Sequence, residues 1–207
     1  MMKMSVIPLP VRTRTMYLKK PNLEVYYPIV EGLNNKMIEQ KINDQIFYNV
    51  NDLIHKQGYP ADPDIEVMGS YEIKTNERNI LSIIIINYAY FGGAHGYTII
   101  KPLTFDMTTG NVITLKDLFK EDSEYVEELS SIIKEQIEQR HLYTLGDFKE
   151  ISSEQEYYLA DKSLIVFFQL YQLVPYAQGF PFFPISLYDI RDLNSEQSIL
   201  RRLLTFY

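Results

Sequence analysis

The chain has 207 residues, of which 46% are hydrophobic and 23% are charged. This composition is typical of a folded globular protein and excludes a disordered chain. The formal net charge is −7, from 20 basic and 27 acidic residues, which argues against a general nucleic-acid binder because phosphate backbones need a basic face. The absence of cysteine excludes disulfides, thiolate metal sites and cysteine nucleophiles.

The chain carries neither of the usual apolar targeting signals. No apolar run reaches the length of a membrane-spanning helix. The first 15 residues contain two prolines and a short apolar stretch, which predicts no signal peptide. We therefore expect a chain without a membrane segment that stays in the compartment where it is made, the cytoplasm by default.

The first third of the chain predicts two strands and a long helix. β-preferring residues predict strands over 11–18 and 23–29. Asn34 or Asn35 is a capping residue for a helix that runs to about Gln57. Apolar residues recur there every three or four positions, which predicts one buried stripe. Its members are Ile38, Ile42, Ile46, Val50, Leu53 and Ile54.

The middle of the chain predicts three strands. The alternation over 65–74 is typical of a strand with one wet face. The run over 80–91 has almost no polar alternate, so this strand should be central and covered on both faces. A glycine-rich corner separates it from a third strand over 97–107.

The last part predicts a helix from Asp122 or Ser123 to about His141, a hairpin of strands over 157–160 and 164–171, and a terminal helix over 195–204. Short turns dominate, so we predict an α+β fold. Its sheet should be largely antiparallel, with the two long amphipathic helices packed on it. The chain is expected either to form one unit or to divide into a strand–helix subdomain over 11–63 and an α+β domain over 64–207, because Pro60 and Pro63 mark a seam.

The glycine corner holds the sharpest candidate residue. Here Gly92, Gly93 and Gly96 surround His95. His95 is the only candidate for catalysis, as a general base or a metal ligand, oriented by Asp106 or by a tyrosine. The alternative is a bulged hairpin in which the glycines adopt positive φ and His95 hydrogen-bonds a neighbouring carbonyl. We favour this alternative and assign no catalytic residue.

Tyrosine is unusually frequent, with 17 Tyr and 11 Phe but no Trp. Aromatic rings with a polar tip suit recognition of a protein or a glycan. Tyrosines are also common as half-buried residues of sheets, and a purely structural role of these tyrosines stays a second interpretation. The residues proposed to bind a ligand lie in the glycine corner and in the segment 171–179, and they are Gly92, Gly93, His95, Tyr97, Tyr171, Tyr176 and Gln178.

No metal site or cofactor is expected. His55 and His141 lie near the ends of different helices and lack metal-binding spacing. The alternating Asp62, Asp64 and Glu66 lack the glycine and final glutamate of a calcium loop. No nucleotide-binding glycine pattern or serine-nucleophile motif occurs.

Three motifs in order carry a resemblance to known domains: GGAHGYT at 92–98, TFDMTTGNVITLKDLF at 104–119 and YQLVPYAQG at 171–179. With YYPIVEGLNNKMIEQKIN at 26–43, they resemble a pair of domains of unknown function. This pair forms the extracytoplasmic part of the lysozyme-sensing sigma-V anti-sigma factor and precedes the catalytic domain in some peptidoglycan deacetylases. The resemblance spans about residues 12–190. It implies an α+β module, usually outside the cytoplasm, with no established catalysis of its own.

Three functions are therefore compared. The first is a non-catalytic binding or sensing module for a protein or a cell-wall glycan. The second is a self-associating structural protein of an envelope or spore layer, whose apolar loop at 176–183 forms the contact. The third is a small hydrolase that uses His95. The sequence leaves the oligomeric state open.

Overall fold

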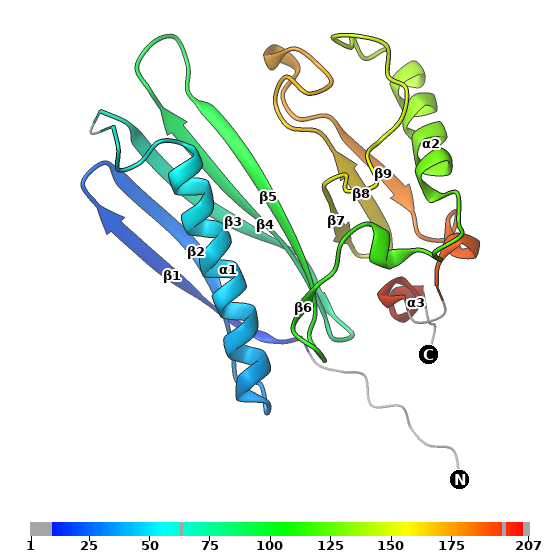
Figure 1. Cartoon of the computed structure of the whole chain (residues 1–207), viewed down its shortest axis with the longest axis horizontal. Coiled ribbons are helices and arrows are strands. Elements are labelled where there is room, and N and C mark those ends of the chain that lie inside the picture. The colour runs from blue at the N-terminus through cyan, green and yellow to red at the C-terminus, as the bar shows by residue number, and fades with distance from the viewer. Residues whose placement is uncertain (1–9, 63, 196–197, 205–207) are drawn as a thin grey trace.

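The structure, a computed structural model, describes residues 10–62, 64–195 and 198–204. Six strands form the larger sheet in the order β1-β2-β3-β4-β5-β6 (Figure 1). Their bounds are β1 Arg12–Lys20, β2 Leu23–Glu31, β3 Glu66–Glu77, β4 Ile80–Tyr90, β5 Tyr97–Asp106 and β6 Asn111–Val112. All neighbours are antiparallel except β2 and β3. The predicted α+β class with a largely antiparallel sheet is confirmed.

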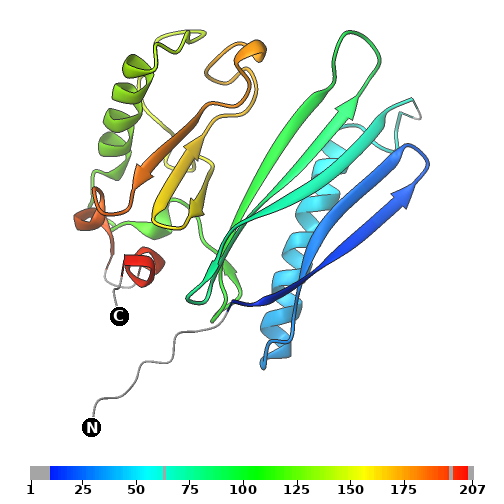
Figure 2. The ribbon, with the colours of Figure 1, turned by 180° about the vertical axis from the view of Figure 1, so that it is seen from behind.

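The parallel pair needs a long connection, which is supplied by helix α1, Lys36–Lys56. Asn35 caps this helix, since its side-chain oxygen accepts hydrogen bonds from the amides of Met37 and Ile38 at 3.0 and 3.2 Å. The predicted stripe buries Ile42, Ile46, Val50, Leu53 and Ile54. Figures 1 and 2 show α1 lying across one face of the larger sheet.

A smaller antiparallel sheet follows, in the order β7-β8-β9. It consists of β7 Tyr157–Ala160, β8 Ser163–Phe167 and β9 Phe182–Ser186. Helix α2, Tyr125–Gln139, packs on β9, and the short helix α3, Ile199–Leu204, lies near the C-terminus. Single 3₁₀ turns occur at η1 Lys116–Leu118, η2 Tyr176–Gln178 and η3 Arg191–Leu193.

The strands thus divide into two lobes, side by side in Figures 1 and 2. We call residues 10–112 the larger-sheet lobe and residues 116–204 the smaller-sheet lobe. Each has its own buried cluster, and a third cluster joins them through Ile84 and Ile100 on one side and Tyr158, Ile165 and Phe167 on the other. The larger sheet is therefore covered by α1 on one face and by the smaller-sheet lobe on part of the other.

Strand β4 explains why this double cover is needed. Its first six residues, Ile80 to Ile85, are all buried, as the apolar run predicts. Ile83 and Ile85 lie in the cluster beneath α1, whereas Ile84 lies in the cluster shared with the smaller-sheet lobe. A strand with apolar residues on both faces is stable only between two layers.

Buried hydrogen bonds fix β7 against the larger sheet. The Thr75 hydroxyl donates to the carbonyl oxygen of Leu159 at 2.9 Å. The Leu159 amide donates to the Ser82 hydroxyl oxygen at 3.0 Å, and Ser82 is also bonded to Thr104 at 2.8 Å. These contacts hold the two lobes in one arrangement.

Several predicted boundaries shift. The second strand of the hairpin ends at Phe167 rather than Tyr171, and α2 is packed on the smaller sheet rather than on the same sheet as α1. Strands β2 and β3, which lie on either side of the proposed seam, pair in one sheet. The N-terminal residues 1–9, Pro63 and residues 196–197 of the predicted last helix lie outside the described residues.

Candidate functional site

The candidate site begins at the tip of the β4–β5 hairpin. Gly92 and Gly93 adopt φ values of +77° and +107°, a region that glycine enters without steric cost. The Tyr90 hydroxyl donates to the carbonyl oxygen of Gly93 at 2.9 Å and closes this turn. A Cβ at either glycine would meet nothing within 4 Å, so the tip is open to solvent.

Gly96 is required for a different reason. A Cβ at this position would lie 2.4 Å from the carbonyl oxygen of Ala89 and 2.4 Å from the Tyr88 ring. Such distances are far below van der Waals contact, so only glycine lets the returning strand pass over Tyr88.

The second part of the site comes from the smaller-sheet lobe, in the segment between β8 and β9. Tyr171 has a φ of +65°, and the turn η2 begins directly after Pro175. Gly179, with a φ of +71°, ends this turn. The segment therefore folds back and presents the Tyr176 ring to the glycine corner.

Two rings from different lobes stack at this point. The ring centroids of His95 and Tyr176 are 4.1 Å apart with an interplanar angle of 19°. The Tyr176 hydroxyl also donates to the carbonyl oxygen of Gly96 at 3.2 Å, and the Tyr171 ring lies 5.6 Å from the Tyr176 ring. The Tyr97 hydroxyl donates across the same junction to the carbonyl oxygen of Leu170 at 3.4 Å.

We call His95, Tyr97, Tyr171 and Tyr176 the aromatic corner. The structure brings these four predicted residues together, although about 75 residues separate the two segments in the chain. Gly92 and Gly93 shape the hairpin tip beside them. The Gln178 side chain donates instead to the backbone carbonyl of Tyr143 at 2.9 Å, so this predicted residue is engaged within its own lobe.

The proposed orientation of His95 by Asp106 is wrong. Asp106 pairs with Ile80 at the other end of the β4–β5 hairpin, and its carboxylate binds Arg202 at 2.7 and 3.1 Å. His95 Nδ1 lies 2.9 Å from the carbonyl oxygen of Gly96. The interpretation of His95 as bonded to a neighbouring carbonyl in a turn is the one that this geometry matches.

Two exposed aromatic residues near the site were not predicted from the sequence: Phe91, which is half exposed at the start of the glycine corner, and Tyr143. Phe91 could have been found, since an aromatic residue directly before a glycine pair is exposed whenever the pair forms a turn. No local signal could have found Tyr143, which is 35 residues away from Gln178.

The described residues contain no group of three or more His, Asp or Glu side chains placed to hold a metal ion. Within the same residues, no helix combines the length and the apolar composition that crossing a membrane requires.

Comparison with known families gives a match for each half of the chain. Residues 17–98 match the family described as "Deacetylase PdaC", and residues 116–188 match the "Protein of unknown function (DUF3298)" family. The order of the two matches confirms the resemblance to the paired module.

Two curated relatives from Bacillus subtilis carry the same resemblance. The chain is 29% identical over 196 residues to the anti-sigma-V factor RsiV. This match covers 87% of this chain and 68% of RsiV. It is 25% identical over 141 residues to the peptidoglycan-N-acetylmuramic acid deacetylase PdaC, covering 65% of this chain. The match spans only 30% of PdaC.

Solved structures share the fold across nearly the whole chain. A crystal structure of a DUF3298 family member from Bacteroides fragilis superposes with a TM-score of 0.71 at 14% identity, covering 93% of this chain and 97% of that one. A DUF3298 family protein from Pseudomonas aeruginosa gives a TM-score of 0.68 at 12% identity, covering 94% and 96%. At such identities the comparison establishes the fold alone.

Proposed function

We propose that this protein is a non-catalytic binding or sensing module whose aromatic corner recognises a protein or a cell-wall glycan. The stacking of His95 on Tyr176 across the two lobes is the observation that carries the proposal. The stacking places the His95 ring in one aromatic surface with Tyr176 of the other lobe, and such rings with polar tips suit recognition of a ligand.

The exposure of the corner supports the same function. Tyr171 is 50% exposed and Phe91 is 51% exposed, so apolar ring surface is available beside polar tips. Tyrosine combines large contact area with a hydrogen-bonding group and few rotatable bonds, which is why it is enriched at recognition surfaces. Because the rings come from both lobes, a ligand bound here would contact both lobes.

The relatives support a regulatory setting. One is an anti-sigma factor, of which this chain spans about two thirds, and the other is a deacetylase of peptidoglycan, of which it spans less than one third. A module common to a regulator and a wall-directed enzyme is consistent with binding rather than with the chemistry of either whole protein.

The test uses purified protein in two assays: sedimentation with purified peptidoglycan and capture of protein partners from cell extract. His95→Ala and Tyr176→Ala are compared with Tyr17→Ala, which removes an exposed tyrosine from β1, outside the corner. We expect both corner variants to lose retention and Tyr17→Ala to keep it. Retention that is insensitive to both corner variants would contradict the proposal.

A further inference from the structure

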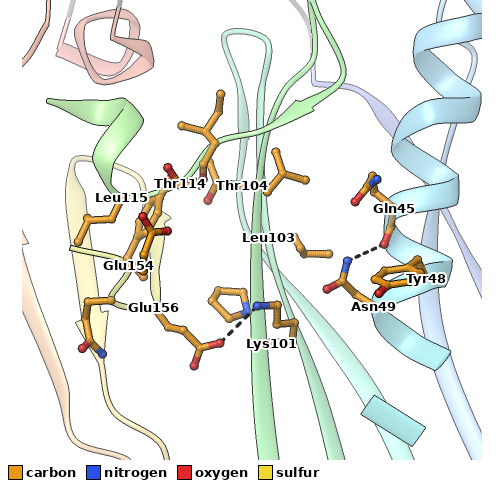
Figure 3. A pocket seen from close by; sticks show the side chains of 15 residues that line it. Gln45, Tyr48, Asn49, Lys101, Leu103, Thr104, Thr114, Leu115, Glu154 and Glu156 are labelled. Carbon is orange, nitrogen blue, oxygen red and sulfur yellow. Dashed lines mark hydrogen bonds and ion pairs between the residues drawn. The ribbon is translucent and has the colours of Figure 1, made fainter. Parts of the chain in front are cut away.

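A groove lies between α1 and the smaller-sheet lobe, separate from the aromatic corner. One cavity of this groove has a volume of about 300 Å³. Gln45, Tyr48 and Asn49 of α1 form one wall, Lys101 of β5 lies at the floor, and Glu154 and Glu156 form the opposite wall (Figure 3). No residue of the aromatic corner lines this cavity.

The α1 wall is a continuous polar stripe. Lys41, Gln45, Tyr48 and Asn49 are spaced four, three and one residues apart, which places them on one helical face. Gln45 also lines a neighbouring cavity of about 470 Å³ together with Lys41. The groove therefore extends along the helix and offers room for more than one ring of an elongated ligand.

Asn49 is the most informative group in the groove. It is only 9% exposed, although buried amides are normally fully hydrogen-bonded. Its Nδ2 donates to the backbone carbonyl of Gln45 at 2.8 Å. Its oxygen accepts no hydrogen bond from the described residues and points away from the helix into the cavity (Figure 3). This oxygen is therefore an acceptor that a donor group of a ligand in the cavity can reach.

The opposite wall supplies further acceptors that are already positioned. Glu156 Oε2 accepts a hydrogen bond from Gln169 Nε2 at 2.6 Å, and Glu156 Oε1 lies 3.5 Å from Lys101 Nζ. Glu154, which is exposed, adds a second carboxylate. The walls thus combine amides, carboxylates and the ammonium groups of Lys41 and Lys101.

An added peptide strand does not fit this groove, because the edge of β5 is closed. Ile100 directs both backbone groups away from β4, and Gln169 satisfies them: the Ile100 amide donates to Oε1 at 3.1 Å and its carbonyl accepts from Nε2 at 2.6 Å. Pro102, two residues further along the same edge, has no amide hydrogen. The Thr104 carbonyl accepts from Ile113. These features block strand addition.

We propose that the groove is a binding site for a neutral oligosaccharide. Sugar hydroxyls donate to the Asn49 oxygen and the glutamates, and accept from Gln45 and Lys101. The apolar face of a sugar ring packs on Tyr48, which is 67% exposed. The two cavities are lined by three carboxylates, those of Asp117, Glu154 and Glu156, and by two lysines. This excess of acidic groups, in a chain of net charge −7, disfavours an anionic sugar.

The test measures binding of the N-acetylglucosamine tetramer to the full chain by titration calorimetry, with the galacturonic acid tetramer as the anionic comparison. We expect saturable binding of the neutral tetramer and at least fivefold weaker binding of the anionic one. Tyr48→Ala should weaken the neutral tetramer about tenfold, which corresponds to about 1.4 kcal/mol. Glu154→Gln should weaken it less, because one acceptor oxygen remains.

Tyr143→Ala is the matched control, since this tyrosine is exposed and lies outside the groove. It should bind as the unaltered chain does, as should Tyr176→Ala in the aromatic corner. Unchanged thermal melting of Tyr48→Ala would show that its fold is intact. The proposal is overturned if the neutral tetramer fails to bind at millimolar concentration, if Tyr48→Ala binds it normally, or if a lysine-rich peptide occupies the groove in its place.

Discussion

Arg202 of α3 forms a two-pronged ion pair with Asp106 at the end of β5, with nitrogen–oxygen distances of 2.7 and 3.1 Å. The Asp106 side chain is only 10% exposed. The same helix end is held from both lobes, since Arg78 donates to the carbonyls of Arg202 and Leu203 and Lys162 donates to that of Leu203. Helix α3 therefore links the two lobes through hydrogen bonds to residues of each.

Replacing Arg202 by Met should destabilise the protein by about 1–3 kcal/mol, because Asp106 would be left buried without its cation. Chemical denaturation monitored by circular dichroism measures the change. Arg12→Met is the control, since Arg12 pairs with Glu31 at an exposed site, where ion pairs contribute little. An equal loss of unfolding free energy in the two variants would show that the buried Arg202–Asp106 pair contributes no more than an exposed pair.

The same pair predicts an acid dependence of stability. Burial by itself raises the pKa of Asp106, but hydrogen bonds from Arg202 and Thr108 outweigh it, so the pKa lies below its ordinary value. A carboxyl with a lowered pKa in the folded state stabilises the protein above its unfolded pKa of about 3.9 and loses this contribution as the pH falls through the lower folded value. Melting temperatures measured downward from pH 7 should fall at the acid end, less steeply in Arg202→Met. Parallel acid profiles would contradict this account.

Gly96→Ala should disrupt the aromatic corner and destabilise the protein by about 1–3 kcal/mol, because its methyl group would collide with the Ala89 carbonyl and the Tyr88 ring. Gly146→Ala is the matched control, since a Cβ there meets nothing within 4 Å and its φ is not positive. Thermal melting measures both variants. An unchanged melting temperature of Gly96→Ala would show that the strand leaves room for a methyl group beside the Ala89 carbonyl and the Tyr88 ring.

Ser82→Ala should weaken the contact between the lobes. It removes the acceptor of the buried Leu159 amide and the partner of the Thr104 hydroxyl, and an unsatisfied buried group costs about 1–3 kcal/mol. Ser70→Ala, at an exposed position of β3, should change stability little. Hydrogen exchange at Leu159 reports the effect directly and should accelerate only in the Ser82 variant.

The division of the chain into independent units stays a prediction, and we propose that the two lobes unfold together. The shared cluster and the buried hydrogen bonds of Thr75 and Ser82 couple them, which favours a single transition. Differential scanning calorimetry tests this. Two separated transitions would contradict the coupling of the two lobes.

Local patterns were sufficient for several elements. The stripe and the capping asparagine predicted α1 to within about one residue at each end, and the apolar run predicted β4 as a strand covered on both faces. The glycine and tyrosine motifs identified the residues of the aromatic corner. These signals depend on residues close together in the chain, so they can be interpreted without a tertiary structure.

Only the tertiary structure decided how these pieces meet. The stacking of His95 on Tyr176, the pairing of Asp106 with Arg202 and the groove between Asn49 and Glu156 each join segments about 80 or more residues apart. The split into two sheets was likewise hidden, because an apolar strand has the same pattern whichever layer covers it. The sequence by itself determined the elements and their buried faces. Long-range packing, which no local period encodes, determined which faces and side chains became neighbours.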